Sequence, residues 1–280
     1  GSFKGLYVQG EDIAQSDPDT QHVTRALSSM ECLVVQDIFL NETAKFAHVL
    51  LPGSSFLEKD GTFTNAERRI SRVRKVMPPL AGYADWQVTV ELSKALGYPM
   101  HYEHPSQIMD EIAALTPTFT GVSYERLERL GSIQWPCNAK APEGTPIMHV
   151  DAFVRGKGRF VVTEYVPTPE RTSRKFPLIL TSGRLVEYEG GGEETRSNPW
   201  LAELQQEAYV EINPKTAAER GIRNGERVWL KSPTGARLNM EALVTERVDS
   251  GTVWMPFHFS GRWQGQDMLK YYPQGAAPMV

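Results

Sequence analysis

The stretch QDIFLNETAKFAHVLLPGSSFLEKDGTFTNAERR, residues 36–69, decides how this chain of 280 residues is interpreted. It begins at the polar end, Gln36-Asp37, of one apolar strand and continues through a short amphipathic helix. A second apolar strand then ends at Pro52-Gly53, and the Gly-containing loop EKDGTFTN follows. Polar residues at the carboxyl ends of neighbouring strands are where an open α/β sheet binds nucleotide-like ligands. The stretch therefore predicts a parallel sheet with a ligand site at one edge.

The surrounding sequence extends this sheet. Nearly continuous apolar runs at 6–8, 33–35 and 49–51 are typical of buried parallel strands. Between the first two runs, Asp17 is expected to cap a helix that carries Pro18 in its first turn, where the missing N–H of proline is tolerated. Residues 1–78 thus predict half of a doubly wound α/β sheet.

The rest of the chain changes character twice. Residues 79–175 predict a helical and irregular connecting region, with helices at 86–96, 106–115 and 123–130 that are each ended by glycine or proline. The part from 134 to 175 is rich in proline, glycine and charge, and it holds one strand candidate at 159–163. Residues 176–280 show short strands separated by turns, with a helix opened by Asn213-Pro214, and they predict a small β-rich barrel.

The composition excludes several classes of function. A net charge of −4 argues against a surface for nucleic acid or anionic lipid. No apolar run approaches the ~20 residues of a membrane span, and no signal peptide is visible. Cys32 and Cys137 form no C-x-x-C pair, and the histidines show no metal-binding spacing, so we expect no metal site. The composition favours a reducing compartment, and we expect a cytoplasmic location and a piece of a longer protein.

Polar residues follow two of the predicted strands. Gly10, Glu11 and Asp12 follow the first strand, and Gln36-Asp37 ends the second. The glycine permits close approach of the backbone to a ligand, and the carboxylates could accept hydrogen bonds from ribose hydroxyls or a guanine edge. The alternative is a solvated turn that merely caps the next helix.

Charged residues also surround Gly61 in the following loop. This loop holds Asn65, Glu67 and the pair Arg68-Arg69. Arginines could neutralise a pyrophosphate through bidentate hydrogen bonds. A charged surface hairpin is an equally good interpretation of the same residues.

The predicted β region carries a run of three glycines, Gly190 to Gly192, shortly after Gly183-Arg184. Consecutive glycines cost backbone entropy and allow a chain to lie flat against a bulky ligand, although glycine-rich loops are often only flexible. His258 lies in a Phe-His-Phe string, where we expect a histidine packed among aromatic rings.

A series of strings occurs in a fixed order along nearly the whole chain. They are GEDIAQSDPD (10–19), the opening stretch, ADWQV (84–88), LGYPMHY (96–102), QWPC (134–137), LILTSGR (178–184), YVEINPKTAAERGIRNGERVWLKSPTG (209–235) and MPFHF (255–259). In this order and spacing they resemble the later part of a formate dehydrogenase catalytic (alpha) subunit. This subunit is a molybdopterin-dependent oxidoreductase of the dimethyl-sulfoxide-reductase superfamily.

The resemblance implies a cofactor, bis-molybdopterin guanine dinucleotide with molybdenum or tungsten. The first segment is similar to half of a Rossmann-like domain that holds one guanosine, and the last resembles the double-psi-like β-barrel domain that closes over both pterins. The positions that match the nucleotide-side motifs are Gly10, Glu11, Asp12, Gln36, Asp37, Gly61, Asn65 and Glu67. The positions that match the pterin-facing motifs are Thr181, Ser182, Gly183, Arg184, Thr195 and His258. The GGGEETRSNPW loop departs from the histidine-containing version of several relatives.

The resemblance also implies a function, the interconversion of formate and carbon dioxide, in which this part binds and orients the cofactor. The family's cysteine-rich iron–sulfur motif and its Cys or selenocysteine metal ligand are absent from this sequence. We therefore expect the iron–sulfur cluster and the catalytic residues in a missing N-terminal part, and no turnover by this chain alone. The partners implied are those N-terminal domains and iron–sulfur, flavin or other electron-transfer subunits. The alternatives are a nitrate reductase of the same superfamily and a non-catalytic scaffold subunit of an electron-transfer complex.

Overall fold

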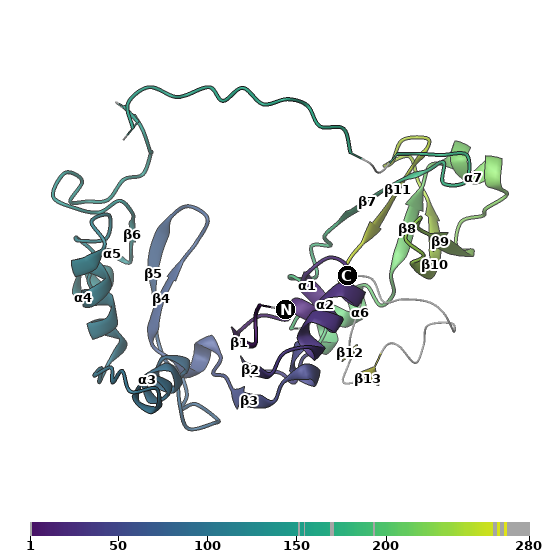
Figure 1. Cartoon of the computed structure of the whole chain (residues 1–280). Helices are drawn as coiled ribbons and strands as arrows, with labels where there is room; N and C mark the ends of the chain where they lie inside the picture. Colours follow the sequence, from purple (N-terminus) through teal and green to yellow (C-terminus); the bar gives the residue numbers. More distant parts are fainter. Residues whose placement is uncertain are drawn as a thin grey trace. The chain divides into compact units, whose positions relative to one another are not determined.

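The computed structural model describes residues 2–150, 152–153, 155–168, 171–192, 194–259, 262–263 and 266–267. The chain forms two compact units (Figure 1). One consists of Gly1–Leu51 together with Val166–Val280, and the other is Pro52–Tyr165. Each is described by itself. Within the described residues, no helix has the length and apolar character of a membrane span.

The N-terminal segment of the first unit contains the three predicted strands. Its sheet has the order β1-β2-β3. The elements are β1 (Gly5–Gln9), α1 (Ile13–Ser16), α2 (Thr20–Ser28), β2 (Cys32–Asp37), the 3₁₀ helix η1 (Thr43–Phe46) and β3 (Val49–Pro52). β1 and β2 are parallel, with Gln9 opposite Gln36. Leu33 and Val35 of β2 are fully buried and pack with Val8 and Leu27, as expected for a strand from the interior of an α/β sheet.

The start of the main helix differs from the prediction. α2 begins at Thr20, and its N-cap is Asp19, whose carboxylate accepts the backbone N–H of His22 at 3.2 Å. Asp17 instead follows the short helix α1 in extended backbone. Two aspartates flank Pro18, and local cap preferences do not distinguish between them.

The C-terminal segment of the first unit is a mixed sheet of five strands in the order β7-β11-β8-β10-β9. Its elements are β7 (Ile179–Gly183), α6 (Pro199–Leu204), β8 (Tyr209–Ile212), α7 (Pro214–Arg220), β9 (Arg227–Lys231), β10 (Arg237–Val244) and β11 (Thr252–Pro256). β11 is parallel to β7, and β10 is parallel to β8. Two short strands, β12 (Arg262–Trp263) and β13 (Gln266–Asp267), pair antiparallel with each other.

The prediction of a closed barrel is wrong for the part of the chain that the structure describes. β7 and β9 stand at the two ends of the sheet order and do not pair with each other. The hydrophobic core contains Val210, Met240 and Val253 of the sheet together with Ala217 of α7. Short strands and tight turns occur in open sheets as well as in barrels, so only the long-range pairing of the terminal strands distinguishes the two.

The second unit combines helices with a small antiparallel sheet of order β4-β5-β6. Its elements are η2 (Phe56–Glu58), β4 (Gly61–Thr64), β5 (Arg69–Val73), α3 (Asp85–Ala95), α4 (Pro105–Leu115), α5 (Tyr124–Leu130) and β6 (Ser132–Gln134). The predicted Gly61 loop is therefore the first strand and turn of a hairpin. The strand predicted at 159–163 does not form, and Phe160 there is 100% exposed.

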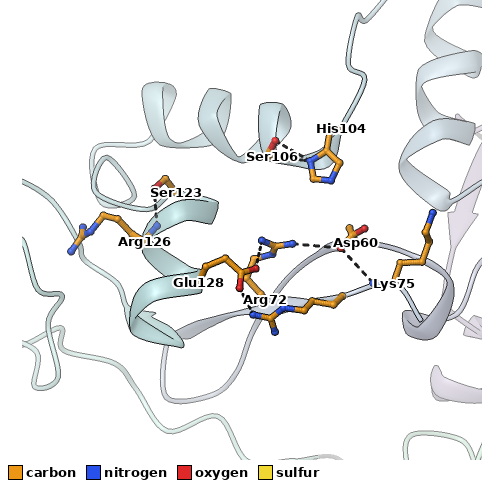
Figure 2. A network of polar contacts seen from close by, with 9 residues as sticks. Asp60, Arg72, Lys75, His104, Ser106, Ser123, Arg126 and Glu128 are labelled. Carbon is orange, nitrogen blue, oxygen red and sulfur yellow. Dashed lines mark hydrogen bonds and ion pairs between the residues drawn. The ribbon is translucent and has the colours of Figure 1, made fainter. Parts of the chain in front are cut away.

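A polar network joins β5 to α5 in this unit (Figure 2). The Arg72 guanidinium lies 2.8 Å from the carboxylate of Glu128 and 3.5 Å from that of Asp60. It also lies over the ring of Tyr124, 3.7 Å from its centroid. The Arg72 side chain is largely buried because it spans the gap between the sheet and the helix.

Gly121 shows how closely this unit is packed around the QWPC string. A Cβ atom at Gly121 would lie 2.6 Å from the Cys137 Sγ and 2.9 Å from the Arg126 guanidinium. Because overpacking a filled core costs about 1–3 kcal/mol, Gly121→Ala should lower the free energy of unfolding by that amount in urea denaturation. Gly158→Ala is the control, since its Cβ would meet no described atom within 4 Å. Equal stability of the two variants would contradict this account of the packing.

Candidate functional site

The carboxyl ends of β1 and β2 meet at one edge, as predicted. The backbone N–H of Gly10 donates to the carbonyl of Gln36 at 2.9 Å, so the loops after the two strands start side by side. Gly10 has φ +63° and is exposed, and a Cβ there would meet no described atom within 4 Å. A glycine with left-handed backbone and open space above it leaves the main chain accessible to a ligand.

Asp12 is occupied by contacts inside the protein. It is 2% exposed, and its carboxylate accepts the backbone N–H of Thr43 at 2.9 Å and the hydroxyl of Thr43 at 2.6 Å. It also accepts the backbone N–H of Glu42 at 3.2 Å and the side-chain amide of Gln15. This carboxylate therefore ties the start of α1 to η1 and fixes the loop that begins at Gly10.

Two other carboxylates at this edge are more accessible. Glu11 is exposed and accepts the Ser16 hydroxyl at 2.6 Å. Asp37 is half-buried, and its oxygens accept the backbone N–H of Phe39 at 3.1 Å and the side-chain amide of Asn41 at 3.0 Å. Gln36 is buried and accepts a hydrogen bond from the Tyr7 hydroxyl. Glu11 and Asp37 are therefore less enclosed than Asp12.

The sequence interpretation missed an apolar surface beside Asp37. Ile38, Phe39 and Leu40 follow β2 directly and are all exposed. Three consecutive large apolar residues in the open are unusual next to polar strand ends, and such patches commonly mark ligand or partner contacts. The sequence already contained a signal for this surface, because three apolar residues follow directly after the polar pair Gln36-Asp37.

The predicted residues of the hairpin make local contacts within the second unit. The side-chain oxygen of Asn65 accepts the backbone N–H groups of Glu67 and Arg69, both at 3.0 Å, and so closes the turn. Glu67 and Arg69 form an ion pair at 3.0 Å. Arg68 donates to the carbonyls of Trp135, Thr145 and Pro146. The role of Gly61, Asn65 and Glu67 in nucleotide binding stays a prediction.

The residues predicted to face the pterin begin on β7, an exposed strand, and continue just after it. Thr181, Ser182 and Arg184 are exposed. Gly183 accepts the backbone N–H of Phe257 at 3.2 Å, and a Cβ there would come within 2.9 Å of the Trp254 indole. β7 therefore lies close against β11 and presents its hydroxyls outward.

The Arg184 side chain is 60% exposed. Its guanidinium lies 3.8 Å from the Glu189 carboxylate and 5.7 Å from the centroid of the Phe257 ring. A loose ion pair of this length leaves guanidinium N–H groups available for another anion.

His258 joins this strand end to the triglycine loop. It is 1% exposed, and its Nε2 accepts the backbone N–H of Leu185 at 3.0 Å while its Nδ1 lies 2.7 Å from the Gly190 carbonyl. The neighbouring rings of Tyr188 and Phe257 confirm the expected packing among aromatics. Thr195 also holds the loop, since its hydroxyl accepts the backbone N–H of Glu189 at 3.1 Å.

Arg196 was missed from the sequence. It is buried, donates through Nη1 to the His258 carbonyl and lies over the ring of Phe259. A Cβ at Gly192 would lie 2.8 Å from the Arg196 Cδ, so this glycine of the run makes room for the arginine. The sequence does contain a signal that could have identified this residue, because an arginine follows shortly after the run of three glycines.

Among the residues that the structure describes, no three His, Cys, Asp or Glu side chains gather in a geometry that could hold a metal ion. A cavity of about 300 Å³ lies on β8 and β10, lined by Glu207, Tyr209, Glu241 and Arg247 among others, and it contains none of the predicted residues.

Two models of known families match this chain. Residues 1–95 match the model of the molybdopterin oxidoreductase family, and residues 178–276 match that of the molybdopterin dinucleotide binding domain. The first match contains the Gly10 edge, which is the edge of the sheet where β1 and β2 end beside Gly10. The second match contains Arg184 and His258.

Similar proteins were found in archaea and bacteria. The alpha subunit of F420-dependent formate dehydrogenase 2 of Methanococcus maripaludis is 42% identical over 91% of this chain and 38% of its own length. The probable oxidoreductase YjgC of Bacillus subtilis is 40% identical over 93% of this chain and 26% of its own. The chain thus spans less than half the length of these relatives. Acetylene hydratase from Pelobacter acetylenicus shares the fold, with a TM-score of 0.67 at 18% identity over 94% of this chain and 38% of that one.

The parallel sheet, the separate five-stranded sheet and both family matches lead to one conclusion: this chain belongs to the molybdopterin oxidoreductases and carries a molybdopterin dinucleotide binding domain.

Proposed function

We propose that this chain is the cofactor-binding part of the catalytic subunit of a molybdenum- or tungsten-dependent formate dehydrogenase. The observation that supports this most strongly is where the two family matches lie. The first match contains Gly10, Glu11 and Asp37 at the ends of β1 and β2, and the second contains Arg184 and His258. The relatives named as formate dehydrogenases favour formate over nitrate as the substrate. The remainder of the subunit and its electron-transfer partners would supply the residues and clusters that this sequence lacks.

The Gly10 edge fits the nucleotide end of such a cofactor. Its open backbone permits close approach, and the exposed carboxylate of Glu11 can accept hydrogen bonds from ribose hydroxyls or a guanine edge, with the half-buried Asp37 beside it. Phe39 and its apolar neighbours offer a surface for a flat base. In this proposal Asp12 shapes the loop and makes no ligand contact, because protein donors already surround its carboxylate.

The exposed residues on and just after β7 fit the more polar and bulky pterin end of the cofactor. The exposed hydroxyls of Thr181 and Ser182 can donate and accept hydrogen bonds, and Arg184 offers a cation for a phosphate. When bound, the cofactor supplies the two-electron chemistry that links formate to carbon dioxide. The residues of this chain bind the group, orient it and neutralise part of its negative charge.

The nucleotide contact can be tested with two matched glycines. Gly10 and Gly221 have φ values of +63° and +67°, and at neither would a Cβ meet a described atom within 4 Å. Alanine at either site should therefore cost a similar strain of about 1 kcal/mol. In the full-length protein, Gly10→Ala should reduce the bound guanine nucleotide several-fold, whereas Gly221→Ala should retain it. Equal nucleotide content in the two variants would contradict a cofactor contact at Gly10.

A further inference from the structure

His258 lies where several parts of the C-terminal segment meet. Its Nε2 accepts from Leu185 just after β7, and its Nδ1 contacts the carbonyl of Gly190 in the triglycine loop. Its own carbonyl accepts a hydrogen bond from buried Arg196. The backbone has φ +130°, a conformation that residues with a side chain rarely adopt. Such a conformation persists where the surrounding contacts fix it.

These contacts define the protonation state of the ring. A carbonyl only accepts, so Nδ1 must carry the proton that it donates to Gly190. A backbone N–H only donates, so Nε2 must be unprotonated to accept from Leu185. Only the neutral imidazole with its proton on Nδ1 satisfies both contacts.

The charges around the ring favour the same state. Burial lowers the pKa of His258, and the positive charges of Arg184 and Arg196 lower it further. The hydrogen bond to Gly190 and the carboxylate of Glu189 act in the opposite direction. Among the described residues, the Tyr188 phenol also lies at the ring, and burial raises its pKa.

We propose that His258 is a positioning residue: its neutral ring clamps the triglycine loop to the end of β7, and protonation of Nε2 releases this loop. The clamp fixes the backbone on both sides of Arg184 and the loop that Thr195 braces. The consequence for cofactor binding rests on the proposed function, because Arg184 contacts a phosphate only in that proposal. The clamp itself can be tested without the cofactor.

The direction of the pH effect follows from the lowered pKa of His258. When the triglycine loop is released, which we call the open state, the His258 ring should have a pKa near its ordinary value of about 6.5. The clamp therefore holds fully above that pH and is lost as the pH falls through the lower pKa of the closed state. Within this window the open population should grow by up to about tenfold for each pH unit.

Amide hydrogen exchange of this chain measures the release directly. After correction for the intrinsic exchange rates, the protection of amides 185–192 should fall between pH 7.5 and 5.0, by up to about tenfold for each pH unit below about 6.5. His258→Gln keeps a donor and an acceptor but cannot titrate, so its loop should show little pH dependence. The control is His101→Gln, an exposed histidine of the second unit, which should behave as the wild type. A pH response that survives in His258→Gln would overturn the proposal.

A second measurement needs no variant. In the wild type labelled with ¹⁵N-histidine, His258 should show the tautomer protonated on Nδ1. His48 and His104 provide an internal reference, because their Nδ1 atoms accept the backbone N–H groups of Leu33 and Ser106 at 3.0 and 3.2 Å. Their neutral rings therefore carry the proton on Nε2. A His258 ring that is protonated on Nε2 at pH 7.5, or that titrates at or above 6.5, would overturn the proposal.

Discussion

Replacing Arg184 by alanine in the full-length protein is expected to lower metal content or formate oxidation at least tenfold. The Arg184 guanidinium is exposed and has only a loose ion pair, 3.8 Å long, with Glu189. The variant would lose a charge-assisted hydrogen bond from this group to a cofactor phosphate. A tenfold loss of rate or binding corresponds to about 1.4 kcal/mol. Metal analysis and formate-dependent dye reduction measure the two effects.

The control for this variant is Arg237→Ala. Arg237 is also an exposed arginine over an aromatic ring, with its guanidinium 4.5 Å from the centroid of Trp229, but it lies on β10 away from the candidate site. It should retain wild-type metal content and rate. If Arg184→Ala matches this control in both measurements, Arg184 is a surface charge and the pterin-side assignment fails.

The second large effect is expected at Asp12. Asp12→Ala removes a buried carboxylate and leaves the buried backbone N–H and hydroxyl of Thr43 without their acceptor. Each unsatisfied buried donor costs about 1–3 kcal/mol, so the variant should lose about 3 kcal/mol or more of the free energy of unfolding. Thermal or urea unfolding of this chain measures the loss directly.

Asp19→Ala provides the comparison, since it removes an exposed N-cap with one hydrogen bond to His22. Loss of such a cap costs about 1 kcal/mol. A stability loss at Asp12 no larger than that at Asp19 would show that the Asp12 contacts do not hold the loop. The result is independent of the cofactor, so it separates the architecture of the edge from its proposed role.

Much of the local structure could be predicted from the sequence because its signals are local. The apolar runs of β1 and β2 gave the correct parallel neighbours, and Asn213-Pro214 marked the start of α7. The Asn213 side chain accepts the backbone N–H of Lys215 at 3.0 Å, as an N-cap does. In these cases neighbouring residues alone determine the conformation.

The features that the sequence could not predict depend on distant contacts. Whether β7 and β9 pair to close a barrel depends on the whole sheet, and no short string encodes it. Glu11 and Asp12 are adjacent carboxylates, yet one is exposed and the other is buried against Thr43, a residue 31 positions away. Sequence reasoning therefore located the edge correctly, but it could not tell which carboxylate faces outward.

The most direct test of the central claim is the cofactor content of the purified full-length protein. The account predicts molybdenum or tungsten in the protein, about two guanine nucleotides released for each metal atom, and formate-dependent reduction of a dye. This chain expressed alone should not oxidise formate. A correctly folded full-length protein that contains neither metal nor guanine nucleotide after expression with molybdate and tungstate would contradict the account.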